Sequence, residues 1–254
     1  MRITVTRSEI HRVLIIAACI FLCASVKAQS NKLQVIPAPK QMTAGEGSFQ
    51  LRDARVVIAD AKSADDQFAA QDFIDDVKAT ANASMSIARS ARKKITIGRV
   101  DSLPIAQALR RMNAAVPASL GEEGYVLLAN ADEVIVAGNT AAGTFYGLET
   151  LKQLVRGDGA NAFIPTVKIV DWPTMRWRGV SDDISRGPVP TLDYIKRQIR
   201  TEACFKMNMH SFYMEHTFSS QSHPLIGPEG GSLTPAEIKE LVAYARSYHV
   251  ELVP

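Results

Sequence analysis

Residues 177–214 read WRGVSDDISRGPVPTLDYIKRQIRTEACFKMNMHSFYM, and this stretch contains the pattern that decides the fold. Its two ends, Trp177–Asp183 and Lys206–Met214, have the length and composition of strands. Between them, Thr191 opens a segment whose apolar residues recur on one face of a helix: Leu192, Ile195, Ile199 and Ala203. The stretch therefore predicts a strand, a helix and a second strand.

The same alternation continues towards Pro254. Thr234-Pro235-Ala236-Glu237 is a capping box with proline at the first helical position, which predicts the start of a second helix. Val250–Val253 predicts a third strand, so the segment as a whole indicates parallel strands with right-handed crossovers. Because a (β/α)8 barrel needs roughly 250 residues, we expect residues 173–254 to be the first part of an incomplete TIM barrel from a longer protein.

A different pattern precedes Pro173, where residues 29–172 are expected to form an α+β domain. Ala64–Ala81 and the segment from Asn139 to Val155 have the apolar spacing of helices. The predicted α/β barrel segment, residues 173–254, would follow this α+β domain directly. Strands are predicted at Val56–Ala59, at Ile95–Gly98, in a hairpin of Gly124–Ala129 and Glu133–Ala137, and in a last pair of Phe163–Pro165 and Val167–Val170.

The first 28 residues are predicted to be a secretory signal peptide. Three arginines precede an apolar core from Val13 to Ala24, and Val26-Lys27-Ala28 is a small-residue cleavage site. This core is too short for a membrane anchor, because a spanning helix needs about 20 apolar residues. Lipid modification at Cys19 is a second alternative. We therefore expect an exported protein, periplasmic or extracellular, with no transmembrane segment in its mature chain.

Charge and composition exclude two classes of protein. The 254 residues contain 29 Lys and Arg against 26 Asp and Glu, and the excess lies in the first 28 residues. The rest is neutral overall, which disfavours nucleic acid as the main partner. A hydrophobic content of 46% with low net charge also disfavours disorder. Cys204 would be alone in the mature chain, and its place on an apolar helix face predicts a core residue rather than a nucleophile.

Glycoside hydrolysis commonly uses two carboxyl groups, and acidic pairs occur at Asp65-Asp66, Asp75-Asp76, Glu122-Glu123, Asp132-Glu133 and Asp182-Asp183. Asp65-Asp66 and Asp75-Asp76 are expected to lie on the polar face of a helix, and Asp132-Glu133 at the tip of the hairpin. Asp182-Asp183 lies at the carboxyl end of a predicted barrel strand, where barrel enzymes place their active sites. For Asp183, a salt bridge to Arg186 is the alternative to a role in the site.

Two other patterns favour no cofactor or metal. The spacing of His210, His216 and His223 matches neither a helical pair nor a known zinc motif. Gly227–Gly231 is rich in glycine but lacks the lysine and the hydroxyl residue of a phosphate-binding loop. We interpret it as an irregular loop before the second barrel helix.

Several motifs occur in a specific order along the mature chain. Asp171–Gly179 reads DWPTMRWRG, Asp183-Ile184-Ser185-Arg186 follows it, and Lys206-Met207-Asn208 comes next. These motifs resemble the first two barrel strands of glycoside hydrolase family 20, the β-N-acetylhexosaminidases. Upstream, Ile36–Pro39 and Gly143–Leu154 resemble the small zincin-like domain that precedes the barrel in this family.

The resemblance implies a substrate-assisted retaining mechanism, in which the 2-acetamido oxygen of the substrate attacks the anomeric carbon. The family's Asp-Glu pair lies on the fourth barrel strand, which we expect beyond Pro254. No catalytic residue is therefore expected in this chain, and these 254 residues alone should be inactive. The implied partner is a glycan that ends in N-acetylhexosamine, with no cofactor.

Five residues are expected to bind substrate, one by this resemblance and four by their positions at the ends of strands. In the family, the arginine before the glycine of the first strand binds sugar hydroxyls, which assigns that role to Arg178 if its side chain points inward; a guanidinium suits paired hydroxyl acceptors. Asp183 ends the first strand, and Tyr213, Glu215 and His216 would lie at the mouth of the second.

The second strand departs from the family pattern, which has His-x-His followed by an acidic pair. Ser211 and Tyr213 occupy the histidine positions, and His216 and Thr217 the acidic ones. Two alternatives to the hexosaminidase therefore stay open. One is a noncatalytic glycan-binding or interaction module, and the other is a related acetamido-assisted glycosidase of different specificity.

Overall fold

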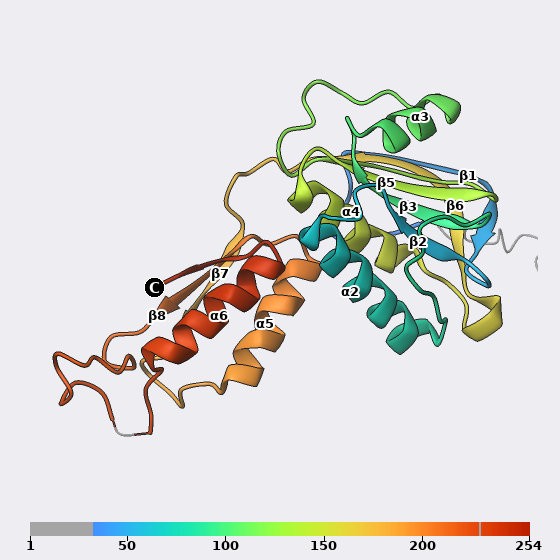
Figure 1. Cartoon of the computed structure of the whole chain (residues 1–254). Helices are drawn as coiled ribbons and strands as arrows, with labels where there is room; N and C mark the ends of the chain where they lie inside the picture. Colours follow the sequence, from blue (N-terminus) through green and yellow to red (C-terminus); the bar gives the residue numbers. More distant parts are fainter. Residues whose placement is uncertain (1–32, 229) are drawn as a thin grey trace, which may run out of the picture. The chain divides into compact units, whose positions relative to one another are not determined.

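The structure is a computed structural model that describes residues 33–228 and 230–254. The signal peptide expected over residues 1–28 lies outside this range. Residues Val35–Pro254 form one compact unit that contains two separate sheets (Figure 1). Across the described ranges, no helix has both the length and the apolar character needed to cross a membrane.

The first sheet has six strands, in the order β1-β6-β4-β5-β3-β2. Strands β2, β3 and β5 are parallel, whereas β4 runs antiparallel to β5 and β6, and β6 runs antiparallel to β1. The strands are β1 (Gln41–Gln50), β2 (Arg55–Ile58), β3 (Lys94–Arg99), β4 (Tyr125–Ala129), β5 (Glu133–Gly138) and β6 (Phe163–Asp171).

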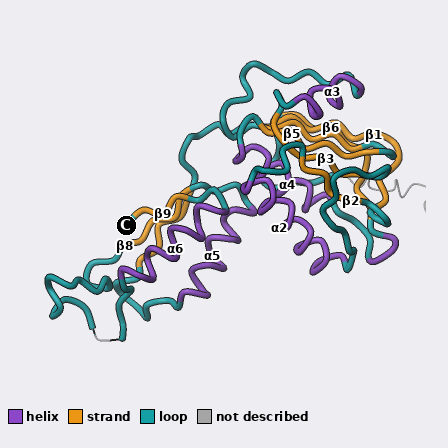
Figure 2. Tube along the Cα trace, in the orientation of Figure 1, coloured by secondary structure: helices purple, strands orange, loops and turns teal. Residues whose placement is uncertain are grey.

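Helices cover both faces of this sheet, as Figure 2 shows with α3 on one side and α2 and α4 on the other. Helix α3 (Leu103–Arg111) packs Ile105 and Leu109 against Leu128 and Ile135. Helix α4 (Ala141–Leu154) approaches the opposite face closely, because a Cβ on Gly147 would lie only 2.5 Å from Val136. Helix α2 (Ala64–Ala81) packs beside α4. Alternate residues of the central strands are therefore buried on both faces.

The second sheet has three parallel strands in the order β7-β8-β9. Strands β7 (Gly179–Asp183), β8 (Met209–Tyr213) and β9 (Glu251–Val253) alternate with α5 (Leu192–Cys204) and α6 (Pro235–Ser247). The expected capping box is confirmed: the Thr234 hydroxyl accepts from the amide of Glu237 at 3.2 Å, and the Glu237 carboxylate accepts from the amide of Thr234 at 2.7 Å. The sequence therefore predicted the order of these five elements correctly.

Side chains alternate between the two faces of this second sheet. Gln198 on α5 donates to the carboxylate of Asp182 at 3.1 Å, and Glu202 on α5 lies 2.9 Å from Nδ1 of His210. Even-numbered residues of β7 and β8 therefore face α5. Odd-numbered residues, which include Asp183 and Tyr213, share the opposite face.

The structure differs from the sequence predictions in one strand pair, one unpredicted strand and one helix boundary. The expected pair Phe163–Pro165 and Val167–Val170 is one continuous strand, β6, which pairs with the unpredicted strand β1. Strand β1 is polar and mostly exposed, so it has little of the hydrophobic alternation on which prediction depends. The helix expected from Asn139 to Val155 is α4, which has Thr140 at its N-cap and begins at Ala141.

One member of each acidic pair of α2 differs from the expectation of a solvated polar face, whereas Asp65 and Asp75 are exposed as expected. Asp66 is only 2% exposed and pairs with Arg99 at 2.8 Å. Asp76 pairs with Lys152 on α4 at 2.8 Å. These carboxylates are partners of cations on other elements, which a single helical pattern does not reveal. Asp132, by contrast, does lie in the β4–β5 turn, where the Asn130 side chain accepts from its amide at 2.9 Å.

Candidate functional site

Polar side chains meet where β7 and β8 end. The strand register places Asp183 directly opposite Tyr213. The guanidinium of Arg186 lies 3.3 Å from the Asp183 carboxylate, 3.8 Å from the Glu215 carboxylate and 5.6 Å from the centre of the Tyr213 ring. We call Asp183, Arg186, Tyr213 and Glu215 the carboxyl-end cluster. It joins three charged groups and one aromatic ring from two neighbouring strands.

A local turn brings Arg186 back over the strand ends. The Asp183 carboxylate accepts from the Ser185 hydroxyl at 2.7 Å and from the Ser185 amide at 3.0 Å, which is an Asx turn. These bonds, with a smaller contribution from Arg186, lower the pKa of Asp183 below its usual value. Asp183 is therefore anionic at neutral pH.

The phenol of Tyr213 is influenced by the neighbouring carboxylate. A hydrogen bond to Glu215 and the negative charge of Glu215 raise the pKa of Tyr213 above its ordinary value. The phenol therefore keeps its proton at neutral pH and acts as a donor. Because the cluster offers two anionic acceptors, a five-donor guanidinium and an aromatic face, its chemistry suits a ligand with several hydroxyl groups.

His216 lies on the loop after β8 and is exposed. Its carbonyl oxygen accepts a long hydrogen bond of 3.5 Å from Ser232. Among the described residues, no hydrogen bond or ion pair involves its imidazole. The structure thus brings together Asp183, Tyr213 and Glu215 of the expected residues, but no contact ties His216 to them.

Arg178 lies at the opposite end of β7, one residue before the strand begins. Its guanidinium pairs with Glu123 at 2.6 Å and donates to the carbonyl of Lys206 at 2.8 Å and to that of Met175 at 2.9 Å. The side chain is 17% exposed. In this structure the Glu123 carboxylate and two main-chain carbonyls are the partners of this guanidinium. The contact of Arg178 with a sugar stays a prediction.

Sequence reasoning used Arg186 as a salt-bridge partner and as part of a family motif, but did not include it among the expected binding residues. Its side chain is 71% exposed and carries the guanidinium of the cluster. The signal was present in Asp183-Ile184-Ser185-Arg186, because an Asp-x-Ser turn at a strand end returns the next residue towards that end.

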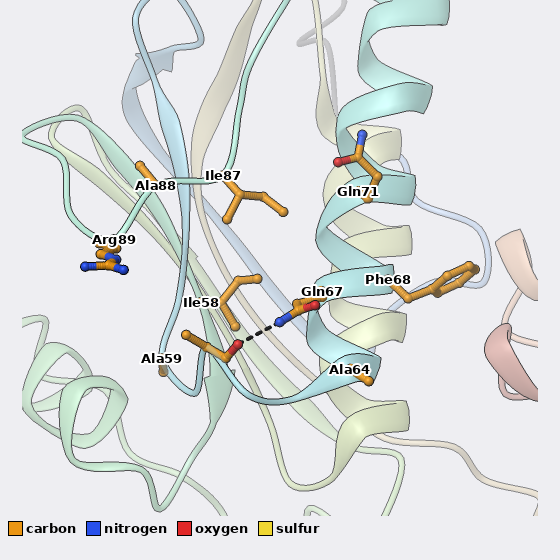
Figure 3. Close-up of a pocket in the computed structure, with 10 residues that line it drawn as sticks. Ile58, Ala59, Ala64, Gln67, Phe68, Gln71, Ile87, Ala88 and Arg89 are labelled. Atoms are coloured by element: carbon orange, nitrogen blue, oxygen red, sulfur yellow. Dashed lines mark hydrogen bonds between the residues drawn. The ribbon is translucent and has the colours of Figure 1, made fainter.

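A hollow of about 830 Å³ lies between α2 and the β2 edge of the first sheet (Figure 3). At its side, Gln67 donates to the carbonyl of Ala61 at 2.7 Å. The lining contains Arg89 but no carboxylate, and none of the expected site residues belongs to it. The described part of the chain also contains no group of three or more His, Cys, Asp or Glu side chains that could hold a metal ion. The carboxyl-end cluster is therefore the stronger candidate site.

Comparisons with known proteins agree with the family resemblance that the order of motifs indicated. Residues 32–172 match the family described as glycosyl hydrolase family 20, domain 2. A β-hexosaminidase of Porphyromonas gingivalis is 25% identical over 93% of this chain and 33% of its own length. The chain spans about a quarter to a third of the length of the curated relatives it matches.

Solved structures share the fold. The chitobiase of Flavobacterium johnsoniae superimposes with a TM-score of 0.72 at 22% identity, over 90% of this chain and 35% of that one. A mutant β-hexosaminidase of Streptomyces plicatus, solved with its product GlcNAc, gives a TM-score of 0.70 at 23% identity, over 87% of this chain and 45% of that one.

Proposed function

Because the chain belongs to glycosyl hydrolase family 20, we propose that it is part of an exported enzyme that removes terminal β-linked N-acetylhexosamine from glycans. Strands β7, β8 and β9 are then the first three strands of a TIM barrel. The mixed α/β fold, shared with family 20 structures, supports this proposal. The Streptomyces plicatus structure contains the product GlcNAc, which supports N-acetylhexosamine as the class of ligand that we propose for this chain.

The single observation that carries the proposal is the carboxyl-end cluster. Arg186 donates to a pair of adjacent sugar hydroxyls, and Asp183 and Glu215 accept from hydroxyl groups. The exposed ring of Tyr213 packs against the apolar face of the sugar. In this assignment Arg186 has the hydroxyl-binding role that the sequence pattern gave to Arg178, because Arg186 lies at the end of the sheet where barrel sites open.

The chemistry divides between the substrate and the protein. The acetamido oxygen of the substrate attacks the anomeric carbon and forms a cyclic intermediate, which water then opens with retention of configuration. A carboxylic acid must protonate the leaving oxygen, and we place the Asp-Glu pair that does this on a strand beyond Pro254. The residues of this chain bind and orient the sugar, so the present 254 residues alone are inactive.

A noncatalytic glycan-binding module is the second candidate. It is favoured by the content of the cluster, which supplies groups for binding, whereas the lowered pKa of Asp183 makes this carboxyl group a poor proton donor at neutral pH. In the same chain, the Glu133 carboxylate of the Asp132-Glu133 pair is bound by Arg111 at 3.2 Å at the base of a turn. We therefore assign the Asp132-Glu133 pair a structural role in the hairpin.

The test is an assay of the complete gene product on 4-nitrophenyl N-acetyl-β-glucosaminide, with free GlcNAc as a competitor. We expect release of 4-nitrophenol and inhibition by GlcNAc. Binding of GlcNAc without turnover would select the glycan-binding module instead. Neither binding nor turnover, under conditions where a known hexosaminidase is active, would overturn both assignments.

A further inference from the structure

Glu123 contacts the two residues that immediately precede β7 and β8. It lies two residues before β4, in the α+β domain. One carboxylate oxygen is 2.6 Å from the guanidinium of Arg178, and the other accepts from the side-chain amide of Asn208 at 2.8 Å. Since Arg178 precedes β7 and Asn208 precedes β8, one carboxylate connects the amino ends of two neighbouring strands.

Asn208 extends this arrangement through the main chain. Its side-chain oxygen accepts from the amide of Arg178 at 2.9 Å, and its side-chain nitrogen also donates to the carbonyl of Arg176 at 2.7 Å. Its own amide donates to the carbonyl of Arg178 at 2.8 Å, and its carbonyl accepts from the amide of Glu251, the first residue of β9, at 2.9 Å. Glu123 therefore binds Asn208, and the hydrogen bonds of Asn208 link the starts of β7, β8 and β9.

The strands are in very close contact at this point. A Cβ on Gly179 would lie 2.0 Å from the carbonyl oxygen of Met209, so only glycine fits there without a shift of the backbone. From Gly179 opposite Met209, the register continues without interruption to Asp183 opposite Tyr213. These two pairs are separated by about 13 Å along the strands. A slip of one residue would turn Tyr213 to the other face.

We propose that Glu123 is a positioning residue: it sets the register of β7 against β8 from their amino ends, and so places the carboxyl-end cluster. The part of this proposal that concerns sugar binding rests on the proposed function. The part that concerns strand register does not. Through this carboxylate the α+β domain acts on the site, although it contributes no residue to the cluster.

The neighbouring residue Glu122 provides a matched control. It is exposed, and its main-chain carbonyl accepts from the Thr140 hydroxyl at 2.8 Å, a contact that a side-chain substitution preserves. Glu122→Gln and Glu123→Gln are the same chemical change at adjacent positions. Only Glu123→Gln removes the negative charge that faces Arg178.

The first measurement uses a disulfide to report the register in this chain itself. Ser181 and Ser211 are opposite each other in β7 and β8, and neighbouring strands lie about 4.8 Å apart, which a disulfide can span. Ser181→Cys and Ser211→Cys are introduced together, with Cys19, Cys23 and Cys204 changed to alanine. We expect Glu123→Gln to slow oxidation of this pair about tenfold, and Glu122→Gln to leave the rate unchanged.

The second measurement uses the complete gene product. Misplaced sugar-binding groups should raise KM for the chromogenic substrate about tenfold in Glu123→Gln, with a smaller fall in kcat, because the proton donor lies elsewhere. A merely structural role would instead reduce the folded fraction, which lowers the apparent kcat and leaves KM unchanged.

Equal oxidation rates in Glu123→Gln and Glu122→Gln overturn the proposal, whatever the activity of the enzyme. If oxidation is slowed in Glu123→Gln but the unsubstituted gene product has no hydrolase activity, the register role is supported. That result then counts only against the proposed function. If Glu123→Gln does not fold, Glu123→Asp replaces it, since this variant keeps the charge but shortens its reach. Slowed oxidation in Glu123→Asp then supports the proposal, and an unchanged rate overturns it.

Discussion

Lys206 and Asp171 form a buried ion pair, with 2.9 Å between the ammonium nitrogen and the carboxylate. The same ammonium donates to the hydroxyl of Tyr125 at 2.8 Å, and that hydroxyl donates to Asp171 at 2.9 Å. Burial lowers the pKa of Lys206, although Asp171 opposes this effect. The pair joins the end of β6 to the segment between α5 and β8, which connects the two sheets.

Replacement of Lys206 by methionine should destabilise the chain by about 3 kcal/mol, because it leaves a buried carboxylate without its cation. The free energy of unfolding in urea measures this effect. Lys168→Met is the control, since Lys168 is exposed on β6, and it should change stability by less than about 0.5 kcal/mol. Equal urea midpoints for the two variants would show that the ion pair does not stabilise the fold.

Arg186→Ala should weaken binding of GlcNAc to the complete gene product by about tenfold to a hundredfold, since hydrogen bonds to a charged donor are lost. Titration of GlcNAc into the protein measures the affinity. Arg197→Ala is the control, because Arg197 is also exposed and also stacks on a tyrosine ring, at 5.1 Å from Tyr194. If Arg178→Ala weakens binding at an unchanged melting temperature and Arg186→Ala does not, the hydroxyl-binding role returns to Arg178.

Glu202→Ala should destabilise the chain by about 2 kcal/mol, because it leaves buried His210 without its hydrogen-bond partner. The carboxylate of Glu202 lies 2.9 and 3.1 Å from Nδ1 of this histidine, whose side chain is fully buried. Glu240→Ala on α6 removes a more exposed pair with Lys196 and should cost less than about 1 kcal/mol. Thermal unfolding of both variants provides the comparison, and a smaller loss for Glu202→Ala than for Glu240→Ala contradicts it.

Cys204 should react with iodoacetamide at pH 8 about a thousandfold more slowly than an exposed cysteine. Burial, with the charge of Glu149, raises the pKa of its thiol to about 12, and only the thiolate reacts. The rate should therefore rise about tenfold for each pH unit while the chain stays folded.

The control for Cys204 is a cysteine at an exposed position, Ser90→Cys with Cys204→Ser. Cys19 and Cys23 are changed to alanine in both proteins. Alkylation followed by mass spectrometry gives the two rates, and denaturing urea should make them equal. Comparable rates in the native chain would mean that the Cys204 thiol is accessible and unperturbed.

Sequence predictions were accurate for elements that are stabilised by residues close together in the sequence. They failed for elements that depend on residues far away in the sequence. The capping box at Thr234 and the helix it starts involve residues within one turn, so the sequence predicted them directly. Strand β1 escaped prediction because its residues are polar and exposed, and it becomes a strand by pairing with β6, more than a hundred residues away. Propensity alone does not reveal such pairing.

The candidate site likewise contains residues that the sequence predicted and a contact that it did not predict. Asp183, Tyr213 and Glu215 were predicted from their positions at strand ends, and the register brings them together. The partner of Arg178 was not predicted, because Glu123, which its guanidinium contacts, lies before β4 and far away in the sequence. A long side chain near a strand can turn towards either end, and a distant carboxylate decides which.

By itself, the sequence determined the alternation of strands and helices after Pro173, the positions of Asp183 and Tyr213 at the ends of two strands, and the family. These follow from periodicity and from the order of motifs. Only the tertiary structure decided which more distant charges meet: Glu123 with Arg178, Lys206 with Asp171, and Arg186 with Glu215. The physical reason is that an ion pair depends on distance in space, and two of these three groups join residues that the chain separates by 35 positions or more.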